Sequence, residues 1–172
     1  STNKYYAAEL GINSAARVTT VKPSGTTSCV LGTSSGIHAW HNDFYIRRIR
    51  VGKNEAIYDY LAINHPELVE DDFFKPETQA VISIPQKAED GGILRHETSI
   101  ELLDRVKDIY QRWIAGGHVT GSNTHNVSCT VSIKEDEWDL VGKWMWDNKD
   151  FYNGLSVLPY FAADSTYTQL PF

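Results

Sequence analysis

The sequence predicts an α/β fold in which parallel strands alternate with helices, and two observations carry this prediction. Runs of β-branched and apolar residues typical of strands occur at 17–21, 79–84, 126–133 and 155–159. Stretches with the apolar spacing of helices lie between them, at 54–64, 98–115 and 135–148. Because a helix usually returns the chain to the same end of a sheet, this order favours parallel pairing.

The first strand, residues 17–21, is expected to end before Pro23 because proline cannot donate a hydrogen bond to a strand ladder. A tight turn and the first turn of a short helix are expected next. After a Gly/Ser-containing connection, apolar and basic residues partly alternate at 44–51, which is typical of a short extended segment.

The middle of the chain predicts a helix and then a strand. Residues 54–64 place Ile57 and Tyr60 on one helical face. The strand follows at 79–84, and Pro85 is expected to end it.

The clearest helix begins at Thr98, which forms a T-x-x-E capping box with Glu101. Its apolar stripe keeps helical spacing as far as Gly116-Gly117 and is expected to lie in the core.

The next helix, residues 135–148, follows the third strand and has acidic residues at its N-terminal end, as the helix dipole favours. Its apolar residues are interpreted as packing against a sheet and not as an aromatic binding platform. They are Trp138, Val141, Trp144, Met145 and Trp146.

Composition indicates one globular domain over residues 1–172 with no internal boundary. The net charge of −6 argues against a nucleic-acid partner, because such binding requires clustered Lys and Arg. No apolar run approaches the ~20 residues that span a bilayer, and the first residues do not have the order of a signal peptide. We therefore expect a cytoplasmic protein with no membrane partner, and the first and last residues suggest a piece of a longer chain.

The segment after the first strand, Pro-Ser-Gly-Thr-Thr-Ser at 23–28, predicts a phosphate-binding turn at the carboxyl end of a strand. Gly25 lets backbone N–H groups face a ligand, the hydroxyl residues add donors, and the first turn of a helix favours a dianion. The alternative is an ordinary turn with a Ser/Thr cap. No Walker pattern is present, which disfavours a simple nucleotide hydrolase. The candidate phosphate-binding residues are Pro23, Ser24, Gly25, Thr26, Thr27 and Ser28.

The histidines and cysteines give no catalytic or metal-binding assignment. His38 and His41 are three residues apart near the predicted turn, which suits a metal or acid–base role, but a polar loop is favoured because no third ligand is evident. His125 is interpreted as part of a structural turn. Cys29 and Cys129 are far apart and encode neither a zinc site nor a CxxC redox pair, so each is expected to be a small buried residue.

Acidic runs occur at 71–72 and 135–137 beside expected helix starts. They are interpreted as caps and solvated faces, since they do not form a convincing carboxylate pair for hydrolysis.

Four blocks of the sequence resemble a known enzyme family: 18–28 (VTTVKPSGTTS), 31–38 (LGTSSGIH), 45–48 (YIRR) and 153–160 (NGLSVLPY). Together they are similar to the C-terminal part of the large catalytic subunit of ribonucleotide reductases, and the nearest branch is the adenosylcobalamin-dependent class II. The resemblance covers nearly the whole chain. Its first block is the most specific, because reductases of several classes carry a P-[ST]-x-[ST] loop that holds the phosphates of the ribonucleotide substrate.

The resemblance implies a ten-stranded α/β barrel of two parallel halves, with this chain forming much of the second half. It also implies radical chemistry, in which a cysteine thiyl abstracts the ribose 3′-hydrogen, the 2′-hydroxyl leaves as water and a cysteine pair donates electrons. The sequence departs from this pattern. It contains no N-x-C-x-E segment and no C-terminal cysteine pair, and no Glu follows two residues after Cys129. Neither Cys29 nor Cys129 is assigned to catalysis.

The resulting hypothesis is a reductase fragment that supplies the substrate-phosphate loop and barrel strands for the production of deoxyribonucleotides, and that is inactive alone. Adenosylcobalamin would be the cofactor of the parent enzyme. The partners would be the rest of the reductase polypeptide, a ribonucleoside di- or triphosphate, and an external dithiol reductant. Two alternatives stay open: an autonomous nucleotide- or phosphate-binding module, and a structural or assembly domain that contacts no ligand.

Overall fold

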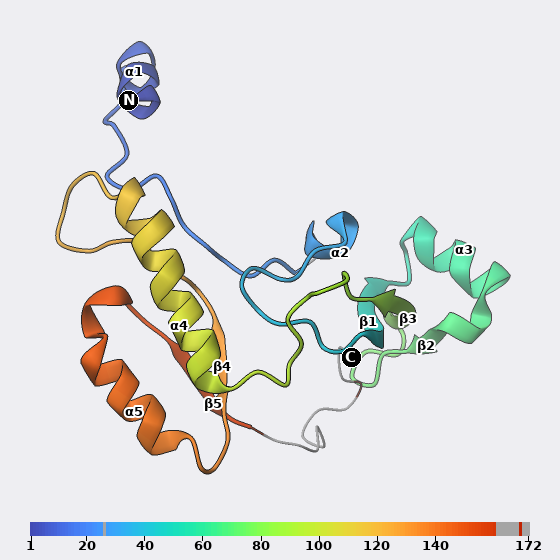
Figure 1. The fold of residues 1–172 in the computed structure, drawn as a ribbon. Helices are drawn as coiled ribbons and strands as arrows, with labels where there is room; N and C mark the ends of the chain where they lie inside the picture. The colour runs from blue at the N-terminus through green and yellow to red at the C-terminus, as the bar shows by residue number, and fades with distance from the viewer. Residues whose placement is uncertain (26, 161–168, 170–172) are drawn as a thin grey trace. The chain divides into compact units, whose positions relative to one another are not determined.

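The computed structural model describes residues 1–25, 27–160 and 169, which belong to two compact units (Figure 1). Unit 1 comprises Ser1–Ala39 and His96–Tyr160, and unit 2 contains Trp40–Arg95 and Gln169. Each unit has its own small sheet. A single domain over residues 1–172 stays a prediction.

Unit 1 combines helices with a two-stranded parallel sheet. β4 and β5 pair with Thr130 opposite Ser156 and Ile133 opposite Pro159, and α5 is the crossover between them. The helices and strands of this unit are α1 (Thr2–Glu9), α2 (Thr27–Leu31), α4 (Ser99–Ile109), β4 (Thr130–Ile133), α5 (Trp138–Asp147) and β5 (Ser156–Pro159). Three single turns complete it: a π-helical turn at Tyr110–Ile114 and 3-10 turns at Ala115–Gly117 and Lys149–Phe151.

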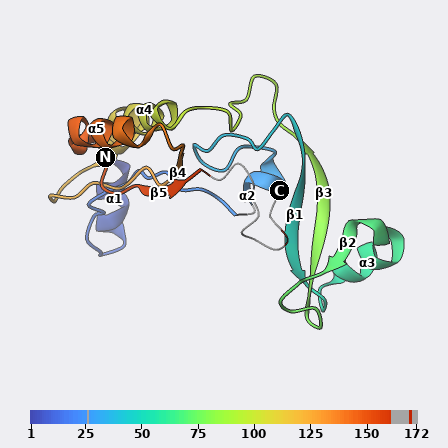
Figure 2. The same ribbon diagram turned by 90° about the horizontal axis from the view of Figure 1, so that it is seen from below.

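The core of unit 1 lies where α4 and α5 pack beside β4 (Figures 1 and 2). Burial of this apolar surface stabilises the unit, at about 25 cal/mol per Å² removed from water. The buried cluster consists of Ile37, Leu102, Leu103, Val106, Ile114, Val127, Cys129, Val131, Ile133, Val141 and Trp144.

Local helix signals predict α4 well. Thr98 Oγ1 accepts a hydrogen bond from Glu101 N, and the Glu101 carboxylate accepts one from Thr98 N at 2.7 Å, which confirms the capping box. The helical stretch reaches Gly117, but its last two turns change to π and 3-10 geometry.

Unit 2 has a three-stranded antiparallel sheet in the order β1-β3-β2. Its two long strands, β1 and β3, are seen side by side in Figure 2. Its elements are β1 (Phe44–Gly52), α3 (Ala56–Asn64), a 3-10 turn (Pro66–Leu68), β2 (Val69–Asp71) and β3 (Gln79–Lys87).

The predicted parallel pairing is therefore wrong for the strand at 79–84. β2 and β3 are joined by the short connection 72–78, which is too short for a crossover and turns the chain back antiparallel. Pro85 does not end the strand, because β3 continues to Lys87 with Pro85 opposite Ile46. β2 pairs with β3 only as far as Ile82, so among the described residues only β1 pairs with the part of β3 that contains Pro85. A proline is tolerated more easily in such an edge region of a sheet than between two paired strands.

The α/β class is confirmed in its coarse form, whereas the ten-stranded barrel is not confirmed. Sheets in the described residues have three and two strands. Residues 17–21 form isolated bridges, Arg17 with His118 and Val21 with Val127, in place of a continuous strand.

Several apolar residues expected to be covered are exposed. In α5, Val141 and Trp144 are buried, but Trp138 and Trp146 have 42% and 73% of their surface exposed. Helix α3 buries none of its residues within the described chain. Across the described residues, no helix combines the length and apolar character needed to cross a membrane.

Candidate phosphate-binding loop

The candidate loop, residues 22–28, leaves a backbone segment that is held against the chain before β4. Val21 forms a parallel bridge with Val127, and Ser128 N donates to Val21 O at 2.9 Å. The loop therefore begins beside the residues that lead into β4, at the carboxyl end of the segment 17–21. The carboxyl ends of the strands expected at 79–84 and 155–159 belong to different sheets, because residues 85–86 lie inside β3 of unit 2 while Pro159 ends β5 of unit 1.

Ser24 organises the described part of the loop. Its Oγ accepts a hydrogen bond from Ser28 N at 3.0 Å, and its carbonyl accepts one from Ser35 Oγ at 2.8 Å. Ser28 is buried, with 4% of its surface exposed, whereas Thr27 is exposed. The side chain of Ser24 therefore caps the first turn of α2, as the ordinary-turn alternative predicts.

Gly25 offers space and not an unusual backbone. A Cβ at this position would meet nothing within 4 Å, and the φ of Gly25 lies outside the left-handed region. None of the described residues therefore fills the space that a side chain at Gly25 would take. Thr26, one of the candidate residues, lies outside the described residues, as does the side chain of Cys29.

A second loop, residues 33–38, lies directly on the first. Gly36 has a φ of +62°, and a Cβ there would stand 3.1 Å from Lys22 O and 3.2 Å from Pro23 Cα. Only a residue without a side chain suits both the left-handed backbone and this close approach. The glycine in the Ser-Ser-Gly sequence is the signal that could have pointed to this contact, which the sequence analysis missed.

The two histidines near the loop belong to different units and have different hydrogen-bond partners. His38 Nδ1 lies 2.9 Å from Ser35 O, and its Nε2 accepts from Thr130 N at 3.0 Å, so both ring nitrogens are engaged. His41 belongs to unit 2, where its Nδ1 lies 3.3 Å from Arg95 Nη1. The described residues contain no cluster of three or more His, Cys, Asp or Glu that could hold a metal ion.

Residues 17–21, which lead into the loop, are fixed by side-chain contacts that the sequence analysis also missed. Thr19 Oγ1 donates to Trp113 O at 2.9 Å, and His125 Nδ1 lies 2.7 Å from Thr19 O. The position of His125 agrees with its interpretation as part of a structural turn.

Cys129 lies in the core, and its burial raises the pKa of its thiol to about 11. A thiol in this environment stays protonated at neutral pH and is a poor nucleophile.

The buried carboxylates act as caps. Glu137 accepts from Ser99 N and Lys134 N; burial opposes its charge, but these hydrogen bonds hold its pKa below the ordinary value. Asp72 accepts from Phe74 N and Lys75 N.

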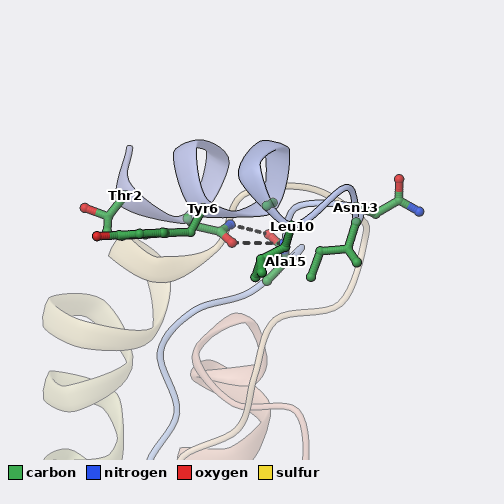
Figure 3. Close-up of a pocket in the computed structure, with 8 residues that line it drawn as sticks. Thr2, Tyr6, Leu10, Asn13 and Ala15 are labelled. Carbon is green, nitrogen blue, oxygen red and sulfur yellow. Dashed lines mark hydrogen bonds between the residues drawn. The ribbon is translucent and has the colours of Figure 1, made fainter.

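A cavity of about 260 Å³ lies at the other end of unit 1's first segment, between α1 and the loop that follows it (Figure 3). Asn3 closes this turn by exchanging two hydrogen bonds with the backbone of Ala15, drawn as dashed lines in Figure 3. None of the candidate residues 23–28 lines it.

No family model matches the chain. Curated relatives include an adenosylcobalamin-dependent ribonucleoside-triphosphate reductase of Lactobacillus gasseri, 27% identical over 161 residues, covering 94% of this chain and 21% of the relative. A probable enzyme of the same name from Dictyostelium discoideum is 30% identical over 182 residues, covering 97% of this chain and 21% of the relative. These similarities confirm the resemblance inferred from the sequence, and the chain spans about a fifth of the length of these relatives.

The fold is similar to the crystal structure of a B12-dependent (class II) ribonucleotide reductase. The TM-score is 0.69 at 24% identity, and the match covers 98% of this chain and 22% of that one.

Proposed function

We propose that this chain is part of the catalytic polypeptide of an adenosylcobalamin-dependent ribonucleotide reductase and that residues 23–28 hold the phosphates of its substrate. The observation that carries the proposal is the similarity to such reductases along 94–97% of the chain, the candidate loop included. The relatives are named as ribonucleoside-triphosphate reductases, which favours a triphosphate over a diphosphate substrate.

The loop has suitable chemistry for this role. Thr27 is an exposed hydroxyl residue, and none of the described residues lies within 4 Å of where a Cβ at Gly25 would stand. Ser24 Oγ accepts from Ser28 N, so its own hydrogen is still able to donate to a ligand. Hydrogen bonds from such donors to a phosphate are charge-assisted and stronger than neutral ones.

The redox chemistry is proposed for the parent enzyme and not for the residues of this chain. Adenosylcobalamin would supply radical initiation when bound, and we assign no residue of this chain to it. Cys129 is too buried to serve as the reacting thiol. The remaining partners in the proposal are the rest of the polypeptide, which completes the barrel, and an external dithiol reductant, with the enzyme acting in the cytoplasm.

The test uses the full-length polypeptide that contains this chain, supplied with adenosylcobalamin, a dithiol and a ribonucleoside triphosphate. Formation of the deoxynucleotide is the expected result. The double variant Thr26→Val and Thr27→Val should raise the substrate KM by at least about tenfold per lost bond, since a hydrogen bond to a charged group contributes about 1.5–3 kcal/mol. Thr120→Val, at an exposed position in the connection after α4, is the matched control.

The same experiment separates the alternatives. Unchanged kinetic constants in the double variant would favour a structural or assembly role. Tight nucleotide binding without any reduction would favour an autonomous binding module.

A further inference from the structure

We infer that His38 is a positioning residue for the phosphate loop, acting through Ser35 on Ser24. This inference deepens the proposed function and rests on it. The imidazole lies between β4 and the loop 33–38, and a chain of hydrogen bonds continues from it to the centre of the loop 22–28.

The first step joins His38 to the sheet. Val21 O accepts a hydrogen bond from Ser128 N, and the segment 17–21 ends at this residue. Two residues further along the chain, Thr130 N donates to His38 Nε2 instead. The imidazole therefore takes the place of a backbone carbonyl at the entry to β4. Because Nε2 accepts, Nδ1 carries the hydrogen and donates to Ser35 O at 2.9 Å.

The second step joins Ser35 to the phosphate loop. Ser35 Oγ donates to Ser24 O at 2.8 Å, and Ser24 Oγ accepts from Ser28 N at 3.0 Å. Ser24 is thus held at its carbonyl from one side and at its hydroxyl from the other, so its position depends on where Ser35 lies.

The loop 33–38 is itself anchored to the core of unit 1. Ile37 is buried in the core, and its carbonyl accepts from Arg105 Nη1 at 3.0 Å. Arg105 is itself ion-paired with Glu97, and both side chains are largely buried. Because Ile37 is anchored in this way, we expect loss of the His38 contacts to be felt within the loop at Ser35, and through Ser35 at Ser24.

This arrangement distinguishes His38 from an acid–base residue. Both of its nitrogens are engaged with backbone groups, so the imidazole affects the substrate through Ser24 and not by proton transfer.

The test compares His38→Ala with Ser35→Ala in the full-length polypeptide. Two readouts are taken: hydrogen exchange of the Ser28 amide, and the split between kcat and KM for a ribonucleoside triphosphate. Both variants should increase exchange at Ser28 and raise KM by about tenfold, with a much smaller change in kcat. Ser35→Ala removes one hydroxyl and leaves the contact of His38 with β4, so it tests the network even where His38→Ala does not fold.

His38→Gln is the conservative variant, because a glutamine amide oxygen can reach the position of Nε2 and accept from Thr130 N. It should recover part of the exchange protection that His38→Ala loses. His65→Ala, an exposed histidine of unit 2, is the control and should change neither readout.

Unchanged exchange at Ser28 in both alanine variants would overturn the positioning role, whatever happens to KM. A loss of kcat with unchanged exchange would also overturn it and would indicate acid–base chemistry. Increased exchange with an unchanged KM would support the positioning role and contradict the phosphate assignment, so the two proposals fail separately.

Discussion

The side chain of Thr19 occupies the space that a Cβ on Gly117 would need. Thr19 also donates to Trp113 O at 2.9 Å, in the π-helical turn that follows α4. The chain before the phosphate loop is therefore fastened to the end of this helical stretch, where Val18 N also donates to Gly117 O at 2.9 Å and Trp113 Nε1 donates to Thr20 O at 3.3 Å.

Gly117→Ala should destabilise the protein by about 1–3 kcal/mol, because the added methyl group forces Thr19 away from its place. Gly116→Ala is the matched control, since a Cβ at Gly116 would meet nothing within 4 Å. Urea denaturation of both variants measures the difference. Equal stability of the two would show that Thr19 moves without cost.

Gly25→Val should leave stability nearly unchanged, because the added side chain enters open space. It should weaken binding of the substrate, since a β-branched side chain obstructs close approach of a phosphate to the loop. Thermal unfolding and the substrate KM of the full-length polypeptide give the two measurements. A large loss of stability with a normal KM would contradict the expected location of the ligand.

Cys129 should resist thiol reagents in the folded protein at neutral pH, because burial raises its pKa to about 11. Labelling of a polypeptide limited to residues 1–172 and carrying Cys29→Ser, in which Cys129 is the one remaining thiol, isolates its reactivity. The thiol should react fully once urea unfolds the chain. The raised pKa also means that this group's contribution to stability is complete below the pKa of the unfolded thiol, about 8.5, and is lost as the pH rises toward 11. Rapid labelling of Cys129 in the folded protein at neutral pH would disprove the expected protection of this thiol.

Asp72 should make the stability of the folded protein depend on pH in the acidic range. The hydrogen bond from Arg50 Nε, 2.7 Å from Asp72 Oδ2, is the main cause that lowers the pKa of this carboxyl, against the opposing effect of burial. A lowered pKa stabilises the folded state above the pKa of the unfolded carboxyl, and this contribution is lost as the pH falls below about 4. Asp72→Asn should be less stable at neutral pH, and its difference from the wild type should shrink in acid.

Unfolding free energies measured over a pH series test this expectation. Asp90→Asn is the control, because Asp90 pairs with Lys87 on the surface with 92% of its side chain exposed. A constant difference between Asp72→Asn and the wild type at every pH would rule out the titration of Asp72 as its cause.

Features determined by a few neighbouring residues could be predicted from the sequence. The capping box needs only Thr98 and Glu101, and the β4-α5-β5 unit follows from two short apolar strands around one helix. The chemistry of Pro23–Ser28 is local in the same sense, and so is the cap that Ser24 places on Ser28.

Features determined by distant residues could not be predicted. Pro85 looks like the end of a strand until it is known that, within the described part of the chain, β1 alone pairs with β3 at this position. Trp146 has the spacing of a core residue, yet α5 turns it outward. His38 carries no sign in the sequence that its partner is Thr130, because the chain between them includes Trp40–Arg95 of unit 2 and then α4.

Unit 1 is interrupted, since the chain leaves it after Ala39 and returns at His96. During translation the strands of unit 2 leave the ribosome before α4 and β4 have been made, as domains fold in the order of synthesis. The nascent chain therefore carries Pro23–Ser28 for a long time without Thr130, the residue that fixes His38. The ability to hold a phosphate ligand would then be acquired late in synthesis, and a polypeptide that stops before β4 would contain the complete motif without its support.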